Sequence, residues 1–270
     1  MMDTIIVGKF LGVSALASVG ATGSINFMII GFCMGVCNGF AIPVAQRFGA
    51  KDEHGMRKFV ANSVWLSIIF AVVMAVLVCV FCRQILELMN TPEDIIDGSY
   101  SYIFVIFLGI PATYMYNLLS GIMRSLGDSK TPLYLLIFSS ILNIILDLLS
   151  IIVLKMGVAG AAWATVIAQA VSGFCCLGVI WKKFPILHVQ REEWQPDKLC
   201  ILNLCNMGIP MGLQYSITAI GSVIIQAAVN SLGSVAVASV AAAVKINMFL
   251  CCPYDAMGST MATYAGQNVG

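Results

Sequence analysis

Long uncharged runs separated by short charged segments dominate the sequence. Each run is long enough for the roughly 20 residues with which an α-helix crosses a bilayer, and the longest is long enough for two helices. Because backbone polar groups in lipid must be satisfied within their own segment, the runs predict helices and not strands. After the longest runs are divided at their turns, the expected helices cover residues 1–11, 13–47, 56–83, 95–124, 132–154, 157–182, 198–230 and 234–268.

The segment at residues 11–49 recurs without a gap at residues 232–270. A repeat of this length in so apolar a chain predicts a membrane protein built from two similar helical bundles. The first expected helix measures only about 16 Å and cannot cross a hydrocarbon core of about 30 Å. We therefore expect a sequence that is truncated at both ends. The identical pairs include Leu11/Leu232, Gly12/Gly233, Ser18/Ser239, Ile25/Ile246, Asn26/Asn247, Gln46/Gln267 and Gly49/Gly270.

The expected fold class is an all-α polytopic membrane protein. Residues 1–183 are expected to form a six-helix lobe whose first helix is cut short, and residues 184–197 an inter-lobe linker. Residues 198–270 then begin a second, repeat-related lobe with helices seven and eight, and helices nine to twelve are absent. Six helices separate the two copies, so both enter the membrane in the same direction.

Composition and charge support a membrane environment and predict an orientation. Hydrophobic residues make up 60% of the chain and charged residues 10%, whereas about a quarter of the residues of a soluble domain carry charge. Lysine and arginine gather in the loops of one side, which the positive-inside rule assigns to the cytoplasm. We therefore expect a multi-pass protein of the cytoplasmic (inner) membrane. The basic side carries Arg47, Lys51, Arg57, Lys58, Arg124, Lys130, Lys182, Lys183, Arg191 and Lys198, and the other side carries Lys9, Arg83 and Lys155.

Four polar side chains are expected at one depth of the first lobe. Asp3 and Asp147 each lie eight residues from an outer turn, about 12 Å below the outer surface. Thr165 reaches the same level on the next helix, and Asn143 shares a helix face with Asp147. Carboxylates that are close together in a poorly solvated cavity resist ionising together, so such a site can load and release a proton. The same oxygens can hold Na⁺, and a purely structural role for each acid is the alternative.

Other features of the apolar segments favour structure over chemistry. Asp255 and Lys245 lie near opposite faces of one helix, and a structural or solvated role ranks above coupling for both. Gly31, Gly35 and Gly39 form a small-residue stripe suited to close helix approach. Most of the ten cysteines fall in apolar helices, where cysteine acts as a small hydrophobe. No metal site, cofactor or nucleic-acid partner is expected. Prolines that permit bending are Pro43, Pro111, Pro210 and Pro253.

Several segments resemble the multidrug and toxic compound extrusion (MATE) family over essentially the whole chain. They are DTIIVGKFLG at residues 3–12, ALASVG at 15–20, AQRFGA at 45–50, GIMRSLGDSKTP at 121–132, Asn143 with Asp147, and GVAGAAWAT at 157–165. Members of this family have two lobes of six helices and exchange H⁺ or Na⁺ for organic, often cationic, compounds by alternating access. The resemblance implies that Asp3, Asn143, Asp147 and Thr165 hold the coupling cation.

The resemblance also favours the DinF-like branch of the family. The other branch places a glutamate soon after a Gly-x-Pro on helix seven, whereas this chain has Gln214, Ser216 and Thr218 after its Gly-Ile-Pro at 208–210. Coupling is therefore expected in the first lobe. Aromatic and amide groups suit flat cations, which makes a further set of residues candidates for lining the substrate cavity, although core packing is an equal alternative. They are Tyr114, Tyr116, Asn117, Gln169 and Gln214.

The sequence thus predicts a cation-coupled antiporter that exports small organic compounds, is no enzyme and acts as a monomer among membrane lipids. One alternative is a flippase for lipid-linked oligosaccharides from the same superfamily. Such a protein needs a basic cavity, and Lys245 is the only cation expected well inside a helix. A remote alternative is an intramembrane aspartyl protease, because Tyr254-Asp255 resembles half of its paired-aspartate signature. The partner motif Gly-x-Gly-Asp is absent from the sequence.

Overall fold

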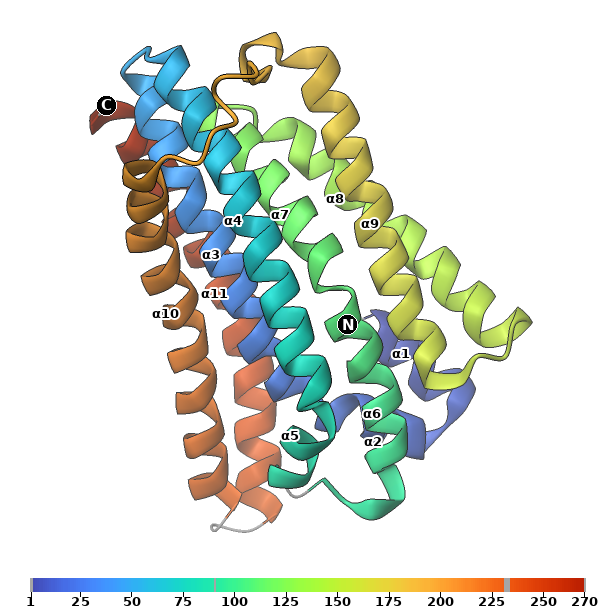
Figure 1. Ribbon diagram of the computed structural model, residues 1–270. Coiled ribbons are helices and arrows are strands. Elements are labelled where there is room, and N and C mark those ends of the chain that lie inside the picture. The colour runs from blue at the N-terminus through green and yellow to red at the C-terminus, as the bar shows by residue number, and fades with distance from the viewer. Residues whose placement is uncertain (1, 90, 231–233, 270) are drawn as a thin grey trace.

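Helices joined by short turns make up the computed structural model, which describes residues 2–89, 91–230 and 234–269 and contains no strand among them (Figure 1). The expected all-α membrane fold is confirmed. A π-helix, η1, covers Leu149–Val153, and a 3₁₀ turn, η2, covers Pro185–Leu187. The α-helices are α1 Met2–Leu11, α2 Val13–Ala21, α3 Gly23–Gly49, α4 Glu53–Val80, α5 Cys82–Leu88, α6 Glu93–Leu108, α7 Ile110–Ser125, α8 Lys130–Leu148, α9 Gly157–Lys183, α10 Lys198–Asn230 and α11 Ser234–Val269.

Two expected helices are broken where the sequence predicted continuity. The helix expected at 13–47 divides into α2 and α3 at Thr22, whose hydroxyl and backbone N–H both donate to the carbonyl of Val19, at 2.8 and 3.3 Å. The helix expected at 95–124 divides into α6 and α7 at Gly109 with a bend of 45°. Pro111 lies in the first turn of α7 and has no N–H to continue the hydrogen bonding of α6.

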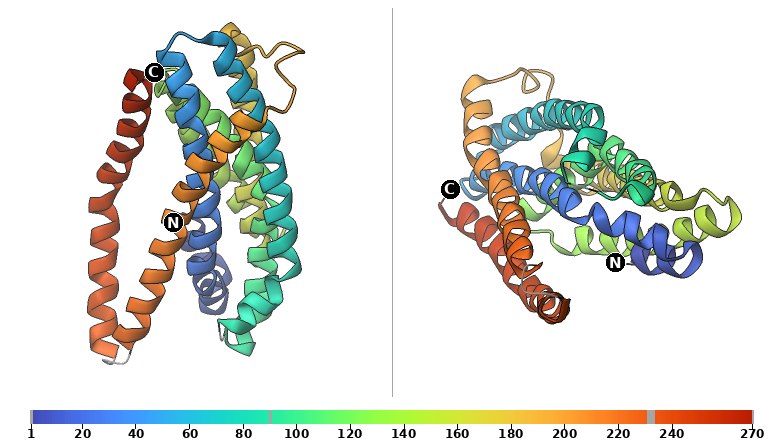
Figure 2. Two further views of the ribbon diagram at one scale, coloured as in Figure 1. Left: turned by 60° about the vertical axis from the view of Figure 1, so that its left-hand side comes forward. Right: turned by 90° about the horizontal axis from the view of Figure 1, so that it is seen from below.

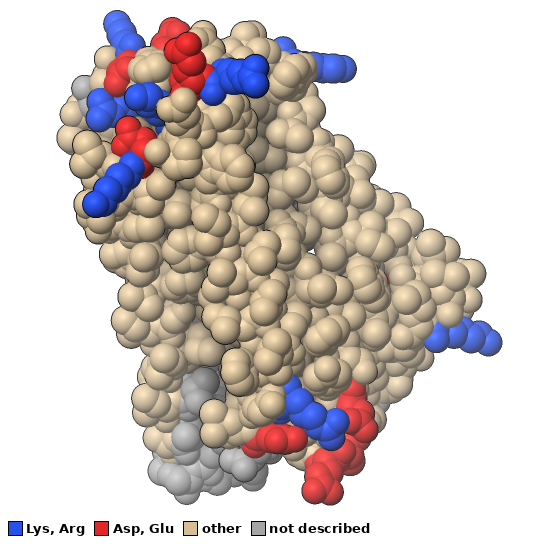
Figure 3. Space-filling view, viewed as in Figure 1, with Lys and Arg blue, Asp and Glu red and all other residues tan. Residues whose placement is uncertain are grey.

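The helices have the length and the surface of membrane spans. Four of the described helical segments, α3, α4, α8 with η1, and α9, are long and apolar enough to cross a membrane, and the bent pair α6 and α7 makes a fifth. A broad uncharged band separates the charged side chains at the two ends of the molecule (Figure 3). The end formed by the α3–α4, α7–α8 and α9–α10 connections carries most of the lysine and arginine, and we call it the basic end.

Helix α3 lies at the centre of the packing. It contacts α4 and α7 on one side and α10 and α11 on the other. At 33 and 36 residues, α10 and α11 are about 50 and 54 Å long. Helix α10 ends and α11 begins at the end opposite the basic end, and α11 runs back to meet the C-terminal end of α3 (Figure 2).

Glycines bring α3 and α10 into backbone contact. A Cβ atom added at Gly39 would lie 2.5 Å from the Cα of Gly208, and one added at Gly35 would lie 2.7 Å from the Cα of Gly212. One added at Gly31 would lie 3.2 Å from the Cβ of Tyr215. The predicted stripe of small residues is therefore the surface on which the α10–α11 hairpin packs.

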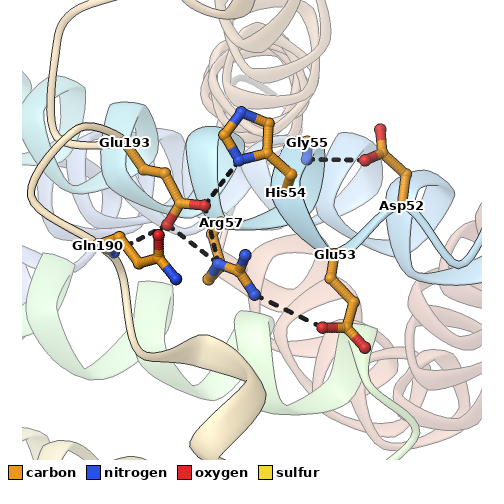
Figure 4. A network of polar contacts seen from close by, with 7 residues as sticks. All are labelled: Asp52, Glu53, His54, Gly55, Arg57, Gln190 and Glu193. Carbon is orange, nitrogen blue, oxygen red and sulfur yellow. Dashed lines mark hydrogen bonds and ion pairs between the residues drawn. The ribbon is translucent and has the colours of Figure 1, made fainter.

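The segment at 184–197 is fastened to α4 through a buried carboxylate. The side chain of Glu193 is 1% exposed and accepts from Nε of Arg57 with both oxygens at 2.9 Å (Figure 4). His54 Nδ1 lies 2.9 Å from Oε1, and the backbone N–H of Gln190 donates to Oε2 at 2.8 Å. Burial tends to raise the pKa of Glu193, but hydrogen bonds from Gln190, Arg57 and His54 lower it below the ordinary glutamate value of 4.5.

The same face of α4 also holds the start of α10. Asn62 accepts from the backbone N–H of Asp197 at 3.0 Å, and the Trp65 indole donates to the carbonyl of Trp194 at 3.1 Å. Asp197 in turn accepts from the backbone of Leu199 at 2.8 Å, in the first turn of α10. The connection between α9 and α10 is therefore bound to α4 along two turns beyond Arg57, and it fixes where α10 enters the bundle.

Candidate functional site

Asp147 is buried in the interior on a helix that is otherwise largely exposed. The Asp147 residue is 0% exposed, and only Pro132 joins it among the buried residues of α8. Leucine and isoleucine side chains such as Leu136, Ile141 and Ile145 are half exposed, as suits a face that contacts lipid. The single acidic residue of this helix thus points toward the protein, and an ionisable group kept at that depth is costly enough to indicate function.

Asn143 and Thr165 join α8 to α9 one turn from Asp147. Nδ2 of Asn143 donates to Oγ1 of Thr165 at 3.2 Å, and the Thr165 hydroxyl donates to the carbonyl of Ala161 at 3.1 Å. Asn143 precedes Asp147 by four residues, so the two side chains share a face of α8. The structure thus brings together two of the four predicted residues directly and places Asp147 beside them.

A π-helix follows this group immediately. The turn η1 begins at Leu149, two residues after Asp147, and its Ser150 is buried against α9. A Cβ atom at Gly160 would lie 3.0 Å from the Cβ of Ser150, so the backbones approach closely here. Single π-turns inside helices occur often at functional sites. The apolar periodicity of residues 132–154 carries no signal for this change of helix type.

Helix α1, which contains Asp3, packs against α8, η1 and α9. The element expected to carry the second carboxylate thus contacts the elements that carry Asp147 and Thr165. The side chain of Asp3 lies outside the described part of the structure, as does that of Lys245.

The five candidates for the substrate cavity lie in different environments. Tyr114 is 1% exposed and packs in the core between α7 and α3, where Cys37 Sγ lies 3.9 Å from its carbonyl. Tyr116, Asn117 and Gln169 are half-buried, and Gln214 is exposed on α10. Asn117 donates to the carbonyl of Thr113 at 2.8 Å. These placements give Tyr114 a packing role and leave the other four accessible.

Two further charged groups lie in different environments. Asp255 is exposed on α11, which agrees with the expected solvated role. Arg124, which the sequence assigned to a loop at the basic side, lies in the last turn of α7, half-buried, with Nη2 donating to Oδ1 of Asn38 at 3.1 Å. Arg124 is therefore a further cation to be considered within the helices, besides Lys245, which was the only one that the sequence led us to expect well inside a helix. Among the described residues, no group of three His, Cys, Asp or Glu side chains could hold a metal ion.

The bundle, its apolar surface and its long apolar helices are those of an integral membrane protein. The MatE family profile matches residues 1–149, and the chain belongs to this family. The probable multidrug resistance protein YoeA of Bacillus subtilis (strain 168) is 30% identical over 280 residues, which cover 100% of this chain and 60% of that protein. The chain therefore spans about three fifths of that relative's length.

Solved structures show the same fold in two conformations. The outward-facing conformation of a multidrug resistance MATE family transporter of the MOP superfamily is 24% identical, with a TM-score of 0.89 over 99% of this chain and 60% of that one. The inward-facing conformation is also 24% identical, with a TM-score of 0.81 over 98% and 59%. Membership of a transporter family leaves the intramembrane protease alternative without support.

Proposed function

We propose that the protein to which this chain belongs is an antiporter that exports small organic, mainly cationic, compounds in exchange for H⁺ or Na⁺. The observation that carries the proposal is the burial of Asp147 beside the Asn143–Thr165 hydrogen bond, on a helix that packs against α1. A carboxylate, an amide and a hydroxyl together offer oxygens for a cation or a site for one proton. Similarity to a protein named for multidrug resistance supports the cargo class.

Alternating access would proceed by separation of the helices that meet at the basic end, which we assign to the cytoplasm. There Nε2 of Gln267 in α11 donates to the carbonyl of Ser125 in α7 at 2.7 Å, and Gly266 packs against Ala45 of α3. The hairpin diverges from the bundle toward the other end (Figure 2). These features and the higher TM-score with the outward-facing transporter support an outward-facing state. Cation arrival at Asp147 would then drive release of cargo and return to the inward-facing state.

Export into everted vesicles tests the proposal on the full-length gene product. We expect Asp147→Asn to abolish the exchange of a fluorescent cation for H⁺ or Na⁺, because an amide cannot carry the negative charge that holds either ion. Asp97→Asn, at an exposed position of α6, removes the same charge outside the site and should leave exchange intact. Undiminished exchange in the Asp147 variant would defeat the proposal. Imposing a proton gradient and a Na⁺ gradient separately identifies the coupling ion.

A further inference from the structure

A small cavity between α3, α7, α10 and α11 contains one cation and several polar groups. Its volume is about 20 Å³, enough for one water molecule. Arg124 is its only ionisable lining residue. Asn38, Ser259 and Thr263 contribute an amide and two hydroxyls, and Ala41 and Met211 contribute apolar surface.

The guanidinium of Arg124 makes no ion pair within 4.0 Å to any carboxylate of the described residues. Its hydrogen bond to Asn38 uses one of the five N–H donors that an arginine offers. Arginine remains charged at all physiological pH values, and a half-buried cation without a counter-charge is costly. The remaining donors and the amide nitrogen of Asn38 suit an anion with two or more oxygens.

The cavity lies directly below the contact that closes the basic end. Ser125, which follows Arg124, accepts the hydrogen bond from Gln267 of α11. Thr263 precedes Gln267 by one turn and Ser259 precedes it by two turns. Movement of α11 away from α7 would therefore break the contact and enlarge the cavity at the same time.

We propose that Arg124, Asn38, Ser259 and Thr263 form a subsite for an anionic group, a carboxylate or a phosphate, of cargo loaded from the basic end. The proposal rests on the export function proposed above and extends the cargo class to compounds that carry an acidic group beside an amine. Arg124 binds the acidic group, and Asn38 positions the guanidinium through the bond at 3.1 Å. In the closed conformation the subsite has room for one water only, so cargo binds when α11 has moved.

The test compares one fluorescent amine scaffold in three forms that differ in a single group: a free carboxylate, a phosphonate and a methyl ester. Export of each is measured with the full-length protein in everted vesicles. We expect Arg124→Gln to reduce export of the two acidic forms about 10-fold or more relative to the ester, since a hydrogen bond to a charged group is lost. Arg124→Lys keeps the charge without the planar fork and should lose less.

Lys130→Gln is the matched control, because it removes a cation from an exposed position of the same end without touching the cavity. An arginine with a merely structural role would, when replaced, lower export of all three forms equally. A loss confined to the two acidic forms therefore indicates that Arg124 binds the acidic group. Equal loss of the three forms, or no loss of any, would overturn the proposal. Wild-type protein that exports the ester but neither acid would also overturn it while leaving the export function in place.

A direct binding measurement distinguishes failure of the anionic subsite from failure of the proposed export function, even when the variant protein does not transport. Fluorescence anisotropy of the carboxylate and ester forms is measured with purified wild-type and Arg124→Gln protein. Weaker binding of the carboxylate alone in the variant supports the subsite without reference to coupling. Identical binding of the carboxylate by both proteins refutes it.

Discussion

The side-chain amide of Asn143 donates to the hydroxyl of Thr165 across 3.2 Å, and this bond connects α8 to α9 one turn from the buried Asp147. Asn143 and Asp147 lie on α8 and Thr165 lies on α9, so a shift of either helix would separate Thr165 from the other two. The bond therefore reports on the geometry that the coupling proposal requires.

Replacing Thr165 by valine tests that bond. The valine keeps the shape but removes the oxygen that accepts from Asn143, which leaves the Asn143 amide without this partner. One net hydrogen bond is worth about 1 kcal/mol, so we expect the apparent affinity for the coupling ion to fall about fivefold. The measurement is the ion concentration, or the pH, that gives half-maximal exchange in vesicles. Thr165→Ser retains the hydroxyl and should behave like wild type, and an unchanged ion dependence in the valine variant would count against a role in coupling.

The sequence predicted the helices well because lipid requires continuous apolar runs, and such runs are visible without any knowledge of packing. The expected helix at 157–182 corresponds to α9 and that at 198–230 to α10 within one residue at each end. The division at Gly109 was not predicted, although Pro111 was named as a residue that permits bending, because an apolar run alone does not show which of its prolines breaks the helix.

Positions that depend on tertiary contacts could not be predicted in the same way. Depth counted from turns placed Thr165 level with Asp147 and Asn143 one turn deeper, whereas the side chain of Thr165 contacts Asn143. A count of loop charges assigned Arg124 to a connecting loop of the basic side, whereas it lies in the last turn of α7, which packs against α3, and donates to Asn38. Likewise nothing local distinguishes Glu193 from the neighbouring Glu192, and only Glu193 is buried.

Gly39 is predicted to be intolerant of any side chain. A Cβ atom there would lie 2.5 Å from the Cα of Gly208 and 2.6 Å from the carbonyl oxygen of Met207, and neither backbone atom can move without shifting α10. We expect Gly39→Ala to destabilise the protein by about 1–3 kcal/mol through overpacking. Thermal unfolding in detergent measures this. Gly221→Ala, in α10 where nothing lies within 4 Å, is the control and should be neutral or stabilising, since alanine favours helix. Similar melting temperatures for the two variants would contradict the close contact.

Glu193 is predicted to hold the α9–α10 connection only while it is ionised. Its pKa is lowered in the folded protein, so its contribution to stability is fully present above 4.5 and is lost as the pH falls through the lowered folded pKa. At neutral pH, Glu193→Gln should cost about 2 kcal/mol. A glutamine keeps only one of the two oxygens that accept from Nε of Arg57, and it removes the buried negative charge that faces the guanidinium.

Melting temperatures of Glu193→Gln and wild type from pH 7 down to well below 4.5 check this, and the difference between them should shrink only as the pH falls through the lowered folded pKa. Glu192→Gln removes an adjacent exposed charge and serves as the control. A difference that does not depend on pH would assign the effect of the substitution to packing and not to the ion pair.

Asp128 connects the α7–α8 turn to the end of α9. Its contribution to stability should be smaller than that of Glu193 and should be lost at a lower pH. Its Oδ2 accepts from Nζ of Lys183 and from the hydroxyl of Thr131, both at 2.6 Å. Partial burial tends to raise the pKa of Asp128, but these hydrogen bonds outweigh it and lower the pKa to about 2. The stabilisation is therefore complete above the ordinary value of 3.8 and disappears as the pH falls toward 2.

The Lys183 side chain is 57% exposed, so solvent screens the pair and we expect Asp128→Asn to cost about 1 kcal/mol or less at pH 7. A double-mutant cycle with Lys183→Met, followed by thermal unfolding at low and high salt, isolates the pairwise energy. That energy should decrease at high salt and vanish near pH 2. A coupling energy near zero already at pH 7 and low salt would mean that Asp128 acts through the hydroxyl and backbone N–H of Thr131, and that Lys183 contributes nothing to holding α9 in place.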